Sequence, residues 1–290
     1  MFPAKFEYVA ASSVEEAIGL LQRENGEGKI LAGGHSLLPL MKLRLAQPRL
    51  LIDIGRVPGL ASIRPEDGYL SIGAMATYRD LIHSEEVRRR IPVLAEAASK
   101  VGDPQVRARG TLVGSLAHAD PAGDMPAVIL ALDGTIKAVG PNGAREIKAD
   151  DFFVDLLTTA LQENEIATAV RVPTMAPRSG AAYVKFDQPA SHYALTGVCA
   201  VVSLGDGGTI RGARIGITGV GPKAYRPTAV ERALLGKQPS EQVVSEASKT
   251  AADGVDVQGD IHASPEYRAH LARVLTRRAV MQAAERARGH

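Results

Sequence analysis

The stretch "ILAGGHSLLPLMKLRL", residues 30–45, places two glycines, a histidine and a serine between a short apolar run and a leucine-spaced segment. This order predicts a strand, a turn and then a helix for which Ser36 is the expected N-cap. Pro39 suits such a helix because the first-turn N–H groups have no acceptor within the helix. Gly33 and Gly34 allow positive φ and close approach of a ligand. The turn could therefore bind an anion such as phosphate, and a plain serine-capped turn is the alternative.

Strand and helix patterns alternate on both sides of this stretch. Residues 6–10 and 50–54 are apolar runs typical of strands. Residues 12–25 predict a helix that a Ser12/Glu15 or a Ser13/Glu16 capping box would open. Two βα units are therefore expected before residue 60, which indicates an α/β arrangement.

The later sequence divides at a stretch rich in proline and glycine, residues 173–181. We expect an N-terminal domain of residues 1–176, with subdomains of about 1–56 and 57–176, and a C-terminal domain of residues 177–290. In the N-terminal domain, the patterns predict strands at 69–74 and 166–173, helices at 77–82 and 91–101, and a hairpin around Asn142 and Gly143. In the C-terminal domain, they predict antiparallel strands at 181–186, 193–204 and 209–220, and helices at 228–235, 240–253 and 265–287.

Composition excludes several classes of protein. The formal net charge is +2 with no basic tract, which makes nucleic acid a poor partner. The longest apolar run, residues 194–204, is too short to cross a membrane, and no signal sequence precedes the first strand, so a cytoplasmic protein is expected. Cys199 is the only cysteine, so this chain can hold neither a disulfide nor a four-cysteine iron–sulfur cluster. P-loop, Rossmann and zinc-binding spacings are also missing.

A second glycine-bearing segment, "RGTLVGSLAHADPAGDMPA", covers residues 109–127. Thr111 and Ser115 offer hydroxyls, and Gly114 allows close approach to the backbone. Asp124 begins an apolar helix, where it could accept hydrogen bonds from a ribose or could simply favour the helix start. A dinucleotide needs two such segments, one on each side of its diphosphate.

Four motifs lie in the same order and at similar separations in a known family. They are "LAGGHSLLPLMKLRLAQP" (31–48), "IGAMATYRDL" (72–81), "VGDPQVRARGTLVGSLAHADPAGDMPAVILALDG" (101–134) and "ENEIATAVRVP" (163–173). The chain resembles the FAD-binding medium subunits of the molybdenum hydroxylases, most of all those of the carbon monoxide dehydrogenase type. The resemblance implies an α/β (α+β) fold. In it, a two-part FAD-binding module of the vanillyl-alcohol-oxidase/PCMH type precedes a C-terminal domain with a three-stranded antiparallel sheet and helices.

The resemblance also implies which residues bind FAD, position by position. Two segments would hold the diphosphate, and other residues would contact the adenosine and the isoalloxazine. The diphosphate residues are Ala32, Gly33, Gly34, His35 and Ser36 in one segment and Thr111, Gly114 and Ser115 in the other. Asp124 would lie near the ribose and adenine, Ile166 would pack near the cofactor, Lys185 would supply positive charge and Tyr193 would cover the isoalloxazine. Val113, Ser115 and Asp187 depart from the family pattern.

The implied function is electron transfer, with no catalytic or metal-binding residue in this chain. Electrons would pass from [2Fe-2S] clusters of a small subunit through FAD to an external acceptor. A large subunit would carry the molybdenum cofactor, and the assembly would be a dimer of heterotrimers. A stand-alone FAD oxidoreductase of the same fold and a flavin-free interaction subunit are the alternatives. The sequence leaves the substrate and the acceptor open.

Overall fold

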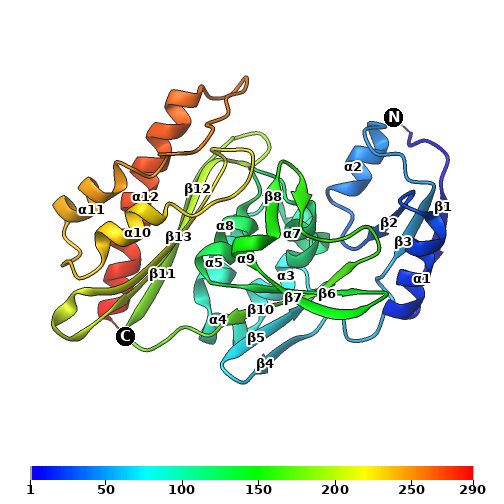
Figure 1. Ribbon diagram of the computed structural model, residues 1–290, viewed down its shortest axis with the longest axis horizontal. Coiled ribbons are helices and arrows are strands. Elements are labelled where there is room, and N and C mark those ends of the chain that lie inside the picture. Colours follow the sequence, from blue (N-terminus) through cyan, green and yellow to red (C-terminus); the bar gives the residue numbers. More distant parts are fainter. Residues whose placement is uncertain (1, 290) are drawn as a thin grey trace.

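A computed structural model describes residues 2–289. Three sheets follow one another along the longest axis of the molecule, as Figure 1 shows. A small parallel sheet from the N-terminal region lies at one end and a five-stranded sheet in the middle. A three-stranded sheet with the C-terminal helices lies at the other end.

The N-terminal sheet is parallel and has the order β1-β3-β2. It therefore confirms the two βα units that the sequence predicts. Ser13 caps the first helix by accepting a hydrogen bond from the N–H of Glu16. The elements are β1 (Glu7–Ala10), α1 (Val14–Glu24), β2 (Gly28–Leu31), α2 (Leu37–Lys42) and β3 (Leu50–Asp53).

The middle sheet is antiparallel, with the order β4-β5-β10-β6-β7. Its strands are β4 (Ile63–Glu66), β5 (Tyr69–Gly73), β6 (Thr135–Gly140), β7 (Gly143–Lys148) and β10 (Ile166–Pro173). The helices of this part are α3 (Tyr78–His83), α4 (Glu85–Arg90), α5 (Pro92–Ser99), α6 (Pro104–Arg109), α7 (Leu112–His118), α8 (Asp124–Ala131) and α9 (Ala149–Phe152). A two-stranded hairpin of β8 (Phe153–Asp155) and β9 (Thr158–Thr159) follows α9.

The C-terminal sheet is the antiparallel meander that the sequence predicts, with the order β11-β12-β13. Its elements are β11 (Ser179–Asp187), β12 (Ala194–Leu204), a short 3-10 turn η1 (Asp206–Gly208), β13 (Ile210–Thr218), α10 (Thr228–Leu234), α11 (Glu241–Ser248) and α12 (Pro265–Arg288). Helix α12 lies along the sheet (Figure 1). Gly180 permits close contact, because a Cβ atom there would lie 2.1 Å from the carbonyl oxygen of Ala283.

Side chains of the C-terminal sheet pack against the helices and the five-stranded sheet in the middle of the molecule. Tyr183 and Cys199 are fully buried in the same apolar cluster as the side chains of the five-stranded sheet and its helices. Burial also raises the pKa of the Cys199 thiol, as expected for a small buried apolar residue. Helix α8 packs against the sheet so closely that a Cβ atom at Gly216 would lie 1.9 Å from the Ala127 carbonyl oxygen. One face of the C-terminal sheet therefore packs against the middle of the molecule, while its other face forms a separate apolar core with α10, α11 and α12.

Three details differ from the sequence prediction. No helix was predicted at residues 104–109 or within the first part of the glycine-bearing segment of residues 109–127. These stretches form α6 and α7, because Pro104 fits the first turn of one helix and Thr111 caps the other. Strand β4 and the β8–β9 hairpin have short or irregular patterns that gave no signal. Helix α11 ends at Ser248, five residues before its predicted end. Of the helices formed by residues 2–289, none combines the length and apolar character that a membrane crossing requires.

Candidate functional site

The first glycine segment follows β2 and leaves several backbone donors unused. Gly34 has φ of 78°, a left-handed conformation that glycine adopts easily. The N–H groups of Gly34, His35 and Ser36 donate to no acceptor among residues 2–289. Ser36 stands at the N-cap position of α2, as predicted, but its side chain does not cap the helix. Its backbone is already helical (φ −103°, ψ −50°) and its hydroxyl makes no capping hydrogen bond, so that hydroxyl is also available to a ligand.

The second segment is the start of α7. The Thr111 side chain accepts a hydrogen bond from the N–H of Gly114 at 3.2 Å. Val113, one of the departures from the family pattern, belongs to this helix and its side chain is buried in the core. Among the described residues, the Val113 N–H has no acceptor. The helix start therefore offers a free donor next to the Thr111 hydroxyl.

The two segments are in direct contact through Gly33. A Cβ atom on Gly33 would lie 2.2 Å from the carbonyl oxygen of Arg109 and 3.0 Å from the Cα of Gly110. The expectation of a positive φ at Gly33 is therefore wrong, whereas Gly33 does line the cavity that a ligand would enter. Only Gly34 has positive φ, and the backbone before α7 occupies the space beside Gly33. Gly33 lets the two candidate anion-binding segments meet.

Thr111→Ala should weaken the start of α7, because the first-turn N–H of Gly114 loses its acceptor. We expect the free energy of unfolding to fall by about 1 kcal/mol, measured by urea denaturation. Thr111→Ser keeps the hydroxyl and should restore most of the loss. Equal stability of the alanine variant and the parent would contradict the capping role.

Both segments face one cavity of about 760 Å³. Asp124, Ile166 and Tyr193 also line it, as do all the predicted residues of the two glycine segments. The structure thus brings together every predicted FAD-binding residue except Lys185, which does not line the cavity. Further lining residues that the sequence prediction missed are Tyr78, Val101, Gly102, Leu157 and Glu163. Tyr78, Val101, Gly102 and Glu163 lie in the four family motifs but were assigned no role there, and Leu157 lies outside those motifs.

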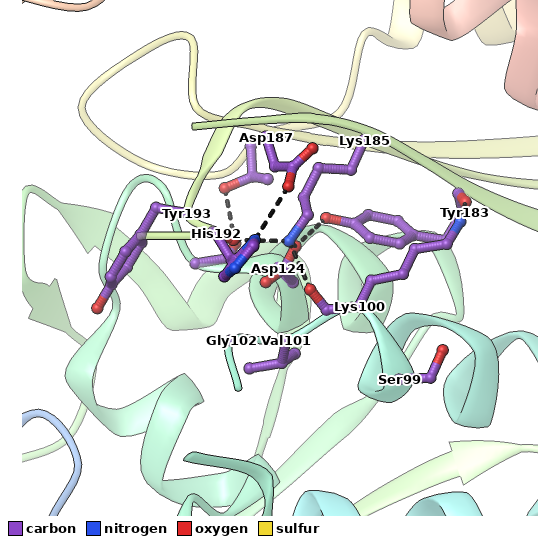
Figure 2. Close-up of polar contacts among 12 residues, drawn as sticks. Ser99, Lys100, Val101, Gly102, Asp124, Tyr183, Lys185, Asp187, His192 and Tyr193 are labelled. Carbon is purple, nitrogen blue, oxygen red and sulfur yellow. Dashed lines mark hydrogen bonds and ion pairs between the residues drawn. The ribbon is translucent and has the colours of Figure 1, made fainter. Parts of the chain in front are cut away.

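Behind the cavity wall lies a buried polar cluster, drawn in Figure 2. Asp124, the first residue of α8, accepts hydrogen bonds from the Tyr183 hydroxyl at 2.5 Å and from Lys185 Nζ at 3.0 Å. Its side chain and that of Lys185 are 6% and 5% exposed. Burial raises the pKa of Asp124, and the adjacent ammonium group opposes that effect. Burial, reinforced by Asp124, also raises the pKa of Tyr183 well above its ordinary value.

The segment between β11 and β12 forms another wall of the cavity. Tyr193 is 44% exposed, and its neighbours Ser191 and His192 also line the cavity. His192 Nδ1 lies 3.3 Å from Asp187 and its Nε2 lies 3.7 Å from Asp103. The hydrogen bond to His192 lowers the pKa of Asp187. Asp187, which departs from the family pattern, therefore contacts this histidine and does not line the cavity.

Comparison with known proteins identifies the family. Residues 4–175 match the FAD-binding domain in molybdopterin dehydrogenases, and residues 181–283 match the C-terminal domain of the carbon monoxide dehydrogenase flavoprotein. The chain belongs to the FAD-binding medium subunits of the molybdenum hydroxylases. The carbon monoxide dehydrogenase medium chain of Hydrogenophaga pseudoflava is 43% identical over 97% of both chains. The nicotine 6-hydroxylase medium subunit of Paenarthrobacter nicotinovorans is 39% identical over 96% of this chain and 97% of its own.

Solved structures of medium subunits have the same fold. The carbon monoxide dehydrogenase of H. pseudoflava that lacks the Mo-pyranopterin moiety superposes with a TM-score of 0.96, and 99% of each chain is covered at 43% identity. Quinoline 2-oxidoreductase from Pseudomonas putida 86 gives a TM-score of 0.93 at 33% identity, again over 99% of each chain. The expected fold class is therefore confirmed. These relatives are parts of multi-subunit enzymes that act on chemically different substrates, so the medium-subunit fold does not specify a substrate.

Proposed function

We propose that the cavity binds FAD through the residues predicted from the sequence other than Lys185. The observation that carries this proposal is the contact between the two glycine segments at Gly33, which places both sets of free N–H donors on one cavity. Such donors favour an anionic diphosphate, because the backbone partial charges point at the ligand without needing a lysine. The Ser36 and Thr111 hydroxyls add polar groups to the same wall.

The other lining residues suit the remaining parts of FAD. Asp124 lines the cavity, and its Oδ1 is already bonded to Tyr183 and Lys185, so its other carboxylate oxygen would accept a hydrogen bond from a ribose hydroxyl. Ile166 provides apolar surface, and Tyr193 offers an aromatic face for the isoalloxazine. When bound, FAD would carry electrons from the [2Fe-2S] clusters of a small subunit to an external acceptor. The protein orients the cofactor and excludes water from one of its faces.

The proposed partners are a large subunit with the molybdenum cofactor and a small iron–sulfur subunit, in a dimer of heterotrimers. No group of three or more His, Cys, Asp or Glu side chains that could hold a metal ion occurs within residues 2–289. The proposal is supported by relatives whose names describe them as medium or FAD-binding subunits of larger enzymes. Co-purification with both partner chains tests it, and a mass that matches two copies of each chain is the expected result.

Titration of the purified full chain with FAD and with FMN tests the cofactor proposal. We expect FAD to bind at least tenfold more tightly than FMN, because FMN lacks the diphosphate and adenosine that the two glycine segments and Asp124 would contact; one charge-assisted hydrogen bond is worth about 1.5–3 kcal/mol. Flavin absorbance after gel filtration and fluorescence titration provide the measurements. Equal affinity for the two flavins would place the diphosphate elsewhere, and no uptake of either would overturn the proposal.

A further inference from the structure

Lys185 joins three separate segments through one ammonium group. Its Nζ atom lies 3.0 Å from Asp124 Oδ1 and donates to the carbonyl oxygens of Lys100 at 2.7 Å and His192 at 2.8 Å. Figure 2 shows the side chain passing from β11 into the space between these three acceptors. An ammonium group has three N–H donors, so all of them are in use. The lysine therefore has no donor left for a ligand.

Each of the three acceptors belongs to a different wall of the candidate flavin cavity. Asp124 lines the cavity at the start of α8. The Lys100 carbonyl immediately precedes Val101 and Gly102, which line it between α5 and α6. His192 lines it next to Tyr193. One buried side chain thus fixes the relative positions of three walls.

We propose that Lys185 is a positioning residue that holds the segment of residues 188–193, and with it Tyr193, against the flavin cavity. This inference rests on the proposed function. It differs from the role that the family resemblance implies, in which this lysine supplies charge near the flavin. The strongest link is the buried ion pair with Asp124, since breaking one partner of such a pair leaves an uncompensated charge. Because Lys185 also donates to the His192 carbonyl, it restricts the position of the neighbouring Tyr193.

The segment of residues 188–193 depends on this link because its other hydrogen bonds are mostly internal. The Gln188 carboxamide accepts from the N–H groups of Ala190 and Ser191, and the His192 N–H donates to the Gln188 carbonyl. Three contacts of His192 lead out of the segment: the hydrogen bond from Lys185 to its carbonyl at 2.8 Å, and ring contacts with Asp187 at 3.3 Å and Asp103 at 3.7 Å. Of these, only the bond from Lys185 holds the His192 backbone. Loss of the lysine donors should therefore make residues 188–193 more mobile while the backbone hydrogen bonds between β11 and β12 remain.

Hydrogen exchange of the flavin-free chain tests the proposal directly. Lys185→Met removes the three donors and keeps most of the side-chain volume, so we expect about tenfold faster exchange in residues 188–193, as for the loss of one charge-assisted hydrogen bond. Strands β12 and β13 should exchange as in the parent. Lys223→Met is the matched control, since Lys223 Nζ also donates to a carbonyl, that of Phe153. Unchanged exchange in residues 188–193 of Lys185→Met would overturn the proposal.

Flavin fluorescence of the FAD-loaded chain provides the second measurement. A tyrosine ring stacked on the flavin quenches its emission, so Tyr193→Leu should raise the fluorescence severalfold. If Lys185 acts through Tyr193, Lys185→Met should give a similar rise and the double variant no further increase. Additive increases would show that the two residues act separately and would overturn the proposal. A parent chain that takes up no FAD would refute the proposed function, whereas the exchange experiment would still decide the role of Lys185.

A variant with paired changes keeps the test usable if Lys185→Met does not fold. Asp124→Asn removes the charge that Lys185 neutralises, so Lys185→Met/Asp124→Asn leaves no unpaired buried ion. Its exchange is compared with that of the parent, in which the ion pair is intact. Faster exchange of residues 188–193 in the double variant supports the proposal, and parental rates in that segment contradict it.

Discussion

Gly33→Ala should lower the affinity for FAD on the order of 100-fold, the loss expected when about two hydrogen bonds to a charged group are removed. The added methyl group would lie 2.2 Å from the Arg109 carbonyl oxygen, which is backbone and cannot rotate away. The two glycine segments must then separate, so that their free N–H groups no longer face the same diphosphate. We also expect the free energy of unfolding to fall by about 1–3 kcal/mol from overpacking.

Fluorescence titration with FAD and urea denaturation measure these two effects. Gly19→Ala is the matched control, because Gly19 lies in α1 and its added Cβ would meet no atom within 4 Å. That change should leave FAD affinity unaltered and stabilise the chain by about 0.5–1 kcal/mol through helix propensity. Parental affinity in Gly33→Ala would show that the contact between the segments is unnecessary for flavin binding.

Gly216→Ala should destabilise the chain by about 3 kcal/mol, the upper end of the usual cost of overpacking. Its methyl group would lie 1.9 Å from the Ala127 carbonyl oxygen, within the helix that begins at Asp124. To avoid this contact, α8 and β13 must move apart, which also shifts Asp124 relative to Tyr183. We therefore expect weaker FAD binding as well as lower stability.

The matched control for this change lies on the same strand. A Cβ atom at Gly212 would approach only the Ser203 side-chain oxygen, at 2.8 Å, and that hydroxyl can rotate. Gly212→Ala should therefore change the free energy of unfolding by less than about 0.5 kcal/mol. If the two alanine variants unfold at the same urea concentration, close packing between α8 and β13 does not limit stability.

Sequence patterns predicted the fold well where periodicity was strong. The alternation around residues 30–54 and the apolar runs of β11, β12 and β13 gave the correct elements and strand directions. The patterns failed where the same residues suit a loop and a short helix equally well. The segment around Gly114 gave no helix prediction, yet the Thr111 cap and the buried Leu112, Val113 and Leu116 make it a helix.

The candidate site was predictable in its residues but not in its contacts. Glycines and hydroxyls marked both segments, yet no pattern could show that Gly33 packs against Arg109, because that contact joins residues far apart in the chain. The contacts of Lys185 could not be predicted either, because they also join residues far apart in the chain. Its type indicated a positive charge near a ligand, whereas its neighbours Asp124, Lys100 and His192 come from three distant segments.

The apolar cluster that contains Tyr183 and Cys199 has a consequence for how the protein is made. The ribosome produces the two glycine segments first, but Lys185 and Tyr193 emerge only after most of the chain, and α12, which covers their sheet, comes last. An N-terminal unit of residues 1–176 would contain both glycine segments but neither Lys185 nor Tyr193, so the cavity gains its last wall only after residue 193 has been synthesised. FAD loading is expected to follow completion of the polypeptide, at the stage when partner chains can assemble with it.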